Sequence, residues 1–384
     1  MIKISDSPQH LKMKKNTIFL VGADTGGHVV PVFALAQELE KDPALRVFVI
    51  GVGSEIEKKF YAKLKNSKYL KISAGKSQFG STTAKIGAFL KSSAGLVKSK
   101  YLILKYRPSV IFLKGNYATL PMAFAARFLA KPVVAHESDA VLGRSNKVIS
   151  SFAKKVFLSY PEEVYDGKIR NGECSGPILR PEFTSAKKKG DDDYKVFNFA
   201  KNLPTVLILG GSLGARTINK NIFGILEKSL SSCQIIHQTG SADFAIASEA
   251  KKTLDKKSQS RYFVSNFIDD ELYSALRIAD LVVSRAGSGV FEIATCGKAT
   301  ILIPYPHAAA DHQSKNARYF TKKSAVEVID EKNLSPTVLY SAISKLLASE
   351  NRRRSMAENL KKSVKLDGRE IIVNYLKRFI NKNG

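Results

Sequence analysis

Four glycine turns, each between a short apolar run and a helical pattern, constrain the fold of this chain most. The first spans residues 21–28 (VGADTGGH); residues 17–21 before it read TIFLV, and Val32, Leu35 and Leu39 after it recur at helical spacing. A strand, a glycine turn and a helix in that order direct backbone N–H groups at a phosphate or sugar oxygen above the strand. A Gly-Gly turn alone is weak evidence, since the glycines can simply turn the chain while His28 caps the helix.

The other three turns are residues 114–118 (KGNYA), 210–216 (GGSLGAR) and 285–289 (RAGSG). The GGS turn gives the strongest phosphate-binding signal, because a strand precedes it and a helix follows it. It lacks the lysine of a P-loop and the spacing of a dinucleotide fingerprint, so neither an ATPase nor a dehydrogenase is favoured. Four such turns in one chain indicate a ligand with phosphates and hydroxyls.

Strand-like runs alternate with helical patterns along the chain, which predicts an α/β fold with parallel sheets and ligands at the carboxyl ends of the strands. We expect two domains whose sheets face a central cleft, at residues 1–183 and 184–366, with a last helix near 367–384 packing back on the first domain. The expected strands are residues 17–21, 46–50, 110–113, 132–135, 156–158, 205–209, 234–237, 262–264, 281–284 and 299–303.

Residues 187–193 (KKKGDDD) contain no apolar side chain and are predicted to be solvated, mobile chain between the domains. The three aspartates are more typical of a charged loop than of a metal site. Cys174, Cys233 and Cys296 are few and scattered, which indicates reduced thiols in a cytoplasm rather than a disulfide framework. No apolar run approaches the roughly 18 residues of a membrane span.

The net charge of +27 favours an anionic partner, such as nucleic acid, a membrane surface or a phosphorylated substrate. It is equally explained by lysines spread over every solvated face. Residues 85–105 interleave large apolar side chains with lysines, which suits either a helix lying on an anionic membrane or an ordinary helix packed on the sheet. The sequence shows no zinc-finger spacing and no basic-aromatic signature of RNA binding.

Three segments together resemble the MurG family of bacterial peptidoglycan glycosyltransferases. They are residues 25–28 (TGGH), residues 210–216, and the run from 284–287 (SRAG) through Glu292 to 312–313 (HQ). The likeness covers nearly the whole chain. It implies the GT-B fold, two Rossmann-like domains around a deep cleft. It also implies an inverting transfer of N-acetylglucosamine from its UDP derivative to the C4 hydroxyl of N-acetylmuramic acid in lipid I, giving lipid II, with no metal or other cofactor.

The resemblance implies roles for the matching residues. His28 would take the proton from the acceptor hydroxyl or stabilise the leaving pyrophosphate. Arg180 would offset charge on the departing UDP, Glu292 would accept both ribose hydroxyls, and the backbone of Ile268 would read uracil. The expected donor contacts are Thr25, Gly26, Gly27, His28, Asp139, Arg180, Ser212, Gly214, Ile268, Ser288, Glu292 and Gln313, and the acceptor-side residues are Gly115, Asn116, Tyr117 and Glu137.

The chain departs from the family pattern at three places. Asn116 stands where the family usually has a second glycine, and residues 136–139 read HESD instead of HEQN. Asp139 can therefore accept a hydrogen bond from a sugar hydroxyl but cannot donate one. The loop from Gly287 to Glu292 is one residue short, which affects the assignment of Ser288.

The resemblance also implies partners and a location. The expected partners are UDP-N-acetylglucosamine, lipid I, an anionic membrane surface and other proteins of cell-wall synthesis and division, but no nucleic acid. The chain would bind peripherally to the cytoplasmic face of the inner membrane. Competing readings are a UDP-N-acetylglucosamine 2-epimerase, which needs no acceptor, and a related glycolipid glycosyltransferase. A basic nucleic-acid-binding protein would leave the glycine turns without a role.

Overall fold

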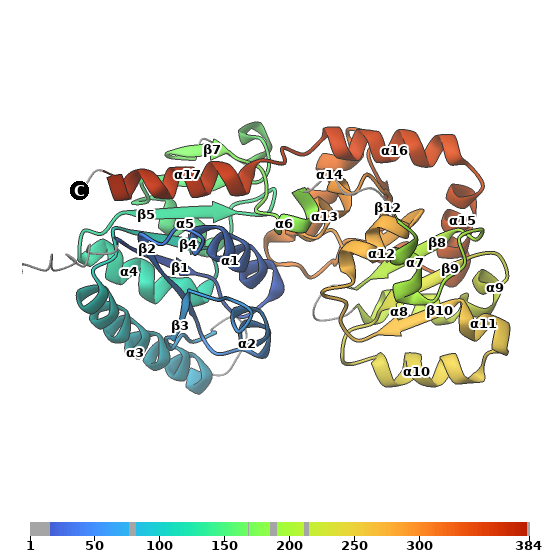
Figure 1. Ribbon diagram of the computed structural model, residues 1–384, viewed down its shortest axis with the longest axis horizontal. Helices are drawn as coiled ribbons and strands as arrows, with labels where there is room; N and C mark the ends of the chain where they lie inside the picture. The colour runs from blue at the N-terminus through green and yellow to red at the C-terminus, as the bar shows by residue number, and fades with distance from the viewer. Residues whose placement is uncertain (1–15, 77–81, 168, 185–189, 211–214, 382–384) are drawn as a thin grey trace, which may run out of the picture.

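The computed structural model describes residues 16–76, 82–167, 169–184, 190–210 and 215–381, and its strands form two parallel sheets that lie side by side (Figure 1). The first sheet has the order β3-β2-β1-β4-β5-β6-β7 and the second the order β10-β9-β8-β11-β12-β13. The strands are β1 (Asn16–Val21), β2 (Leu45–Gly51), β3 (Lys68–Lys71), β4 (Val110–Lys114), β5 (Val133–Glu137), β6 (Lys155–Leu158), β7 (Gly172–Cys174), β8 (Thr205–Leu209), β9 (Gln234–Gln238), β10 (Tyr262–Ser265), β11 (Leu281–Ser284), β12 (Ala299–Leu302) and β13 (Glu327–Val328).

Helices connect the strands, as parallel pairing requires. They are α1 (Gly26–Leu39), α2 (Glu55–Tyr61), α3 (Thr82–Tyr106), α4 (Leu120–Phe128), α5 (Arg144–Ser150), α6 (Pro181–Thr184), α7 (Asp191–Phe197), α8 (Arg216–Phe223), α9 (Leu226–Leu230), α10 (Phe244–Thr253), α11 (Lys256–Ser260), α12 (Leu272–Ile278), α13 (Val290–Thr295), α14 (His312–Thr321), α15 (Pro336–Leu347), α16 (Glu350–Lys362) and α17 (Gly368–Asn381). Short 3₁₀ turns are η1 (Tyr117–Thr119), η2 (Glu162–Val164), η3 (Ala309–Asp311) and η4 (Glu331–Asn333).

The first sheet is buried on both faces, as a parallel sheet requires. Alternate residues of β1 enter different cores: Ile18 and Leu20 pack with side chains of α1 and α17, whereas Phe19 and Val21 pack with those of α3 and α4. Continuous apolar strands such as TIFLV therefore follow from burial on both sides. The predicted α/β class with two Rossmann-like sheets is confirmed.

All ten predicted strands are present, with ends that differ by at most two residues. The three strands that were not predicted, β3, β7 and β13, have four, three and two residues and lie toward the sheet edges. β3 reads KYLK, with lysines at both ends. Such short segments form strands because a neighbouring strand offers hydrogen bonds. Their own residue pattern gives little indication that they are strands.

The last helix crosses back to the first half of the molecule (Figure 1). Side chains of α17, including Ile372 and Leu376, join the core that contains β1, and Tyr375 makes an edge contact with Phe157 of β6, with ring centroids 5.3 Å apart. The division at residues 183 and 184 stays a prediction.

The prediction that residues 187–193 are solvated, mobile chain is wrong for Asp193 and for the absence of structure, whereas Asp192 is exposed as predicted. Residues 187–189 lie outside the described part. Residues 191–197 form α7, and Asp193 is only 5% exposed. Its carboxylate accepts from the Gly190 N–H at 2.9 Å and pairs with Arg277 at 2.5 Å. An ion pair with a residue far along the chain is invisible to a local charge pattern.

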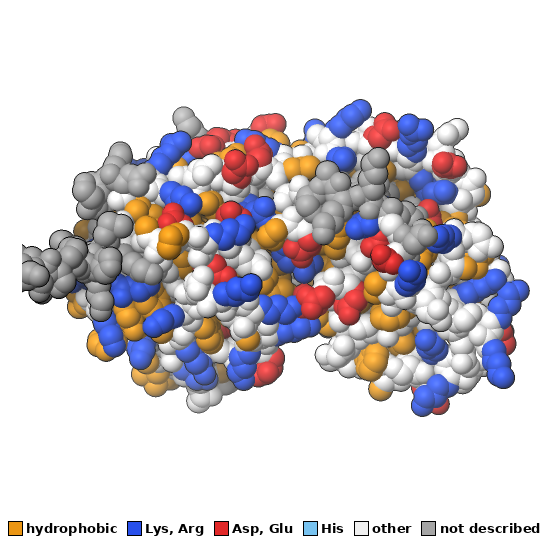
Figure 2. Space-filling view, in the orientation of Figure 1, with side chains coloured by type: hydrophobic (Ala, Val, Ile, Leu, Met, Phe, Trp, Pro, Cys, Tyr) orange, Lys and Arg blue, Asp and Glu red, His pale blue; other side chains and the backbone are white. Residues whose placement is uncertain are grey.

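Basic side chains are spread over both halves of the face seen in Figure 2. On the outer face of α3 they are interleaved with exposed apolar side chains, among them Phe89, Leu90 and Val97. The described helices include none long and apolar enough to cross a bilayer.

Candidate active site

One cleft of about 1680 Å³ lies between the two halves. Every predicted site residue in the described part of the chain lines it, from Thr25 and His28 in the first half to Glu292 and Gln313 in the second. Ser212 and Gly214, predicted to hold the UDP phosphates, lie outside the described residues, so their roles stay predictions.

The first glycine turn packs too closely for side chains. A Cβ on Gly22 would lie 2.4 Å from the His28 carbonyl oxygen and 2.5 Å from Val32 Cγ2, so α1 can approach β1 only at glycine. The buried Glu57 carboxylate accepts from the Asp24 N–H at 2.9 Å, and the Tyr61 hydroxyl donates to the Gly22 carbonyl at 2.6 Å. These bonds hold the turn from behind.

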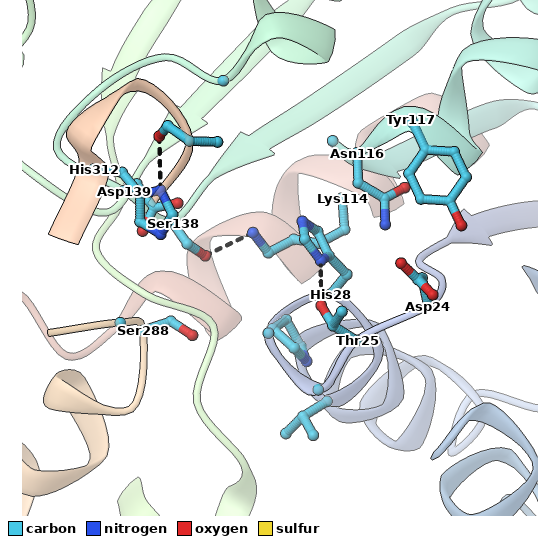
Figure 3. Close-up of a pocket in the computed structure, with 18 of the residues that line it drawn as sticks. Asp24, Thr25, His28, Lys114, Asn116, Tyr117, Ser138, Asp139, Ser288 and His312 are labelled. Atoms are coloured by element: carbon cyan, nitrogen blue, oxygen red, sulfur yellow. Dashed lines mark hydrogen bonds between the residues drawn. The ribbon is translucent and has the colours of Figure 1, made fainter. Parts of the chain in front are cut away.

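His28 lies at the cleft floor with its imidazole held by Thr25, whose Oγ1 is 2.9 Å from Nδ1 (Figure 3). Burial, and then the positive charge of Lys114, lower the pKa of His28 to about 3, although a hydrogen bond to the Gly115 backbone opposes them. The imidazole is therefore neutral near pH 7, the form that can accept a proton.

The second glycine turn is held against the first by Asn116. Its Nδ2 donates to the Ala23 carbonyl at 2.6 Å and its Oδ1 accepts from the Ala118 N–H at 3.0 Å. The asparagine that departs from the family pattern thus joins the two turns. A Cβ on Gly115 would lie 1.9 Å from Asn146 Oδ1, so glycine is required there.

Tyr117 and Asp24 form a polar cluster at the side of the cleft, near Asn116 (Figure 3). Asp24 has a φ of 77°, a left-handed conformation that is uncommon for a residue with a side chain, and its carboxylate lies 3.4 Å from the Lys76 ammonium. Burial, and then the Asp24 carboxylate, raise the pKa of Tyr117 to about 12, so the phenol stays protonated.

Glu137 organises the loop after β5 rather than pointing freely into the cleft. Its carboxylate accepts hydrogen bonds from the N–H groups of Ser138, Asp139 and Gly143 and from Asn146 Nδ2, at 2.8–3.0 Å. Burial raises its pKa, and the Gly143 and Asn146 hydrogen bonds oppose that shift. The predicted acceptor-side residue thus acts on the loop that carries Asp139.

Asn316 joins the two halves at this loop. Its Nδ2 donates to Asp139 Oδ1 at 3.0 Å and to the Ala286 carbonyl at 2.9 Å, and its Oδ1 accepts from the Ala140 N–H at 2.7 Å. The side chain is fully buried. No local sequence pattern indicates Asn316, because only the folded chain brings α14 against residues 139–140.

Arg180 and Glu292 face each other across the halves. Arg180 Nε lies 3.6 Å from Glu292 Oε1, and Nη1 lies 3.4 Å from Asp269 Oδ1. Burial raises the pKa of Glu292, and the Arg180 guanidinium acts in the opposite direction. The charge of each group compensates that of the other.

Two further residues predicted to bind UDP-N-acetylglucosamine already form hydrogen bonds within the protein. The Ile268 N–H donates to Gln238 Oε1 at 2.9 Å, and Gln313 Oε1 accepts from the Tyr305 N–H at 2.9 Å. Ser288 instead faces the first turn, since its Oγ would lie 3.3 Å from a Cβ on Gly27. Gln238, at the end of β9, was missed, although its place at a strand end was a usable signal.

Lys114 and Ser138 lie in the sequence motifs at residues 114–118 and 136–139 but were not predicted to be site residues. Lys114 ends β4, is 2% exposed, and donates to Ser138 Oγ at 2.6 Å (Figure 3). Within the described ranges, no group of three or more His, Cys, Asp or Glu could hold a metal ion.

Comparisons with known proteins show the family to which the chain belongs. Residues 18–158 match the glycosyltransferase family 28 N-terminal domain and residues 205–370 its C-terminal domain. Proteins from Clostridium perfringens and Thermodesulfovibrio yellowstonii, both named UDP-N-acetylglucosamine–N-acetylmuramyl-(pentapeptide) pyrophosphoryl-undecaprenol N-acetylglucosamine transferase, are 33% and 35% identical. The first match covers 95% of this chain and 99% of the relative, and the second 86% and 89%.

Solved structures show the same fold. MurG of Acinetobacter baumannii superposes with a TM-score of 0.71 at 23% identity, covering 95% of this chain and 99% of that one. A Neisseria meningitidis UDP-GlcNAc 2-epimerase bound to UDP-GlcNAc gives 0.67 at 12% identity, covering 94% and 100%. The fold is therefore common to transferases and epimerases, and the sequence relationship distinguishes them. The chain belongs to the MurG family of glycosyltransferase family 28 and is a hexosyltransferase of the GT-B fold.

Proposed function

We propose that the chain transfers N-acetylglucosamine from UDP-N-acetylglucosamine to the C4 hydroxyl of the N-acetylmuramyl group of lipid I, with inversion at the anomeric carbon. One observation supports this most: the described candidates for both substrates line a single cleft. The acceptor candidates lie at the ends of β4 and β5, and Ile268, Glu292 and Gln313 lie opposite on the second half. The names of the relatives state the same reaction.

His28 is the proposed base. The acceptor oxygen forms a bond to C1 of the donor sugar while the bond from C1 to the β-phosphate oxygen breaks and its electron pair leaves with UDP. The hydroxyl proton passes to the neutral imidazole. The low pKa of the free enzyme's His28 rises when two pyrophosphate groups enter the cleft, because negative charge stabilises the imidazolium.

The donor is held by the second half in this proposal. The Glu292 carboxylate accepts the ribose hydroxyls, and Arg180, whose Nε is buried without a hydrogen-bond partner in the described part, offsets charge on the leaving UDP. Uracil binding at Ile268 requires the Gln238 side chain to release the Ile268 N–H.

The test is release of UDP from UDP-N-acetylglucosamine with and without a lipid I analogue, in wild type and in His28→Ala. Release that needs the acceptor and falls at least about 100-fold in the variant supports the transferase and the base, since general-base catalysis contributes about 10²–10⁴-fold. Release of UDP and an altered sugar without acceptor would instead identify an epimerase. Rapid acceptor-dependent release by His28→Ala would refute the role of His28 as the base but leave the transferase proposal intact.

We also propose that α3 and its neighbours bind an anionic membrane surface. α3 does pack on the sheet through Leu102 and Ile103, but packing on the sheet does not account for its outer face. There Phe89 is 71% exposed and Val97 69%, and on the adjacent α4 Phe128 is 72% exposed. The full exposed set on these helices and α5 is Ile86, Phe89, Leu90, Val97, Tyr101, Leu104, Phe124, Phe128 and Val148. Lysines stand among them, and Lys100 Nζ lies 3.7 Å from the Phe128 ring centroid.

This surface would bring the cleft to the cytoplasmic face of the inner membrane, where lipid-linked acceptor and other proteins of cell-wall synthesis and division act. Vesicles of phosphatidylglycerol and phosphatidylethanolamine test it. Each lysine near an anionic surface contributes about 1 kcal/mol, so changing Lys91, Lys98 and Lys100 together to Glu should abolish co-sedimentation. The matched change of Lys220, Lys256 and Lys257 should not, and equal binding by both triple variants would refute the membrane assignment.

A further inference from the structure

The Lys114 ammonium is buried but has few partners. Lys114 is 2% exposed and lines the cleft, and an ammonium carries three N–H donors. Its bond to Ser138 Oγ, at 2.6 Å, is its one hydrogen bond within the part of the chain that the structure describes. Two donors therefore have no protein acceptor among the described residues and can bind a polar group that enters the cleft.

The nearby carboxylates do not use these donors. Glu137 and Asp139 are close enough to raise the Lys114 pKa. In the described part of the chain, however, neither carboxylate lies within 4.0 Å of the Lys114 ammonium as an ion pair. The Glu137 oxygens already accept four N–H groups, and Asp139 accepts from Asn316. Burial outweighs both charges and lowers the Lys114 pKa, so the surrounding protein groups do not fully stabilise the charged form.

The position of the ammonium indicates what would satisfy it. In Figure 3 the Lys114 side chain reaches from the end of β4 past His28 toward Ser138. Lys114 and His28 are near enough for the ammonium to lower the His28 pKa. An anionic oxygen bound there would accept charge-assisted hydrogen bonds and stabilise the ammonium at once.

We propose that the two unused N–H donors of Lys114 bind a phosphate oxygen of a pyrophosphate-linked sugar at the floor of the cleft, beside His28. The inference rests on the proposed function for the identity of that sugar. The pyrophosphate belongs either to the UDP donor or to the lipid-linked acceptor, since both substrates carry one and both must reach His28.

Calorimetric titration separates the two sources. Lys114→Met and Lys114→Gln are titrated with UDP and with UMP, which differ by the β-phosphate, and the KM for a lipid I analogue is measured in turnover. If Lys114 binds the donor, the ratio of UDP affinity to UMP affinity should fall at least about tenfold, the factor of one charge-assisted hydrogen bond. If it binds the acceptor, the KM for the lipid I analogue should rise by at least about the same factor. The affinity ratio does not depend on the fraction of each variant that is folded.

Two control variants distinguish binding from a structural role. Ser138→Ala removes the same Lys114 contact but keeps the ammonium, so it should have less than one third of the effect of Lys114→Met. Lys155→Met removes a lysine from β6 of the same sheet, where it pairs with Glu173 at 2.5 Å outside the cleft, and should change neither quantity.

The outcomes are separable from the fate of the proposed function. Lys114 variants that match wild type in both measurements, or a Ser138→Ala effect equal to that of Lys114→Met, would overturn the inference even if the wild type transfers sugar. A wild type that transfers no sugar, but whose UDP-to-UMP ratio collapses in Lys114→Met, would refute the proposed function and support phosphate binding by Lys114.

Discussion

Asn316 provides the sharpest test of how the two halves are joined. Replacing it with alanine removes three hydrogen bonds, to Asp139 Oδ1 at 3.0 Å, to the Ala286 carbonyl at 2.9 Å and from the Ala140 N–H at 2.7 Å. A neutral hydrogen bond contributes about 0.5–1.5 kcal/mol and one to a charged group about 1.5–3 kcal/mol, so the three sum to about 2.5–6 kcal/mol. Water entering beside Asp139 rehydrates its carboxylate, so we expect the lower end, about 3 kcal/mol.

The assay combines urea unfolding with amide hydrogen exchange. The free energy of unfolding should fall by that amount, and the Ala140 amide, which loses its acceptor, should lose protection. Asn359→Ala is the matched control, because Asn359 donates one 3.3 Å bond at the surface, to the Ser324 carbonyl, and should change stability by less than about 0.5 kcal/mol. An Asn316→Ala protein within about 0.5 kcal/mol of wild type and with a protected Ala140 amide would refute the reasoning.

Two further predictions concern the site, and a third concerns a buried histidine of β9. Lys114→Met should raise the pKa of His28 above about 3, yet leave it below 6.5 because burial is the larger cause; histidine NMR titration checks this, and an unchanged pKa would contradict it. Gly115→Ala should lower the thermal midpoint, since its Cβ would lie 1.9 Å from Asn146 Oδ1, whereas Gly287→Ala, with no atom within 4 Å, should be tolerated in the same thermal scan. His237 is buried with a pKa lowered to about 3, so the unfolded state binds its proton first as pH falls below 6.5 and stability is lost toward pH 4. Urea unfolding at a series of pH values gives the slope of the unfolding free energy against pH. Over that range the slope should be smaller in His237→Gln than in wild type by up to about 1.4 kcal/mol per pH unit, and equal slopes would contradict the lowered pKa of His237.

The alternation of apolar runs, glycine turns and helical patterns was enough to predict the α/β class and every described strand of five or more residues. These features are local: a strand buried on both faces needs a continuous apolar run, and Gly22 is required by contacts with His28 and Val32, a few residues along the chain. The requirement for Gly115, by contrast, comes from Asn146 on α5 and is a tertiary contact. The ends of β1, β4, β8 and β11 indicated a phosphate- and sugar-binding site for the same reason, because parallel strands bring their carboxyl ends to one edge.

Only the tertiary structure decided which side chains meet across long stretches of chain. Asp193 pairs with Arg277, Asn316 holds residues 139–140, and the Ile268 N–H is occupied by Gln238. Lys114 illustrates the reason: its place at the end of a strand was visible in the sequence, but its burial and its two unused donors depend on Ser138, Glu137 and Asp139 around it. Local pattern determines the elements, whereas desolvation and pairing depend on how those elements pack.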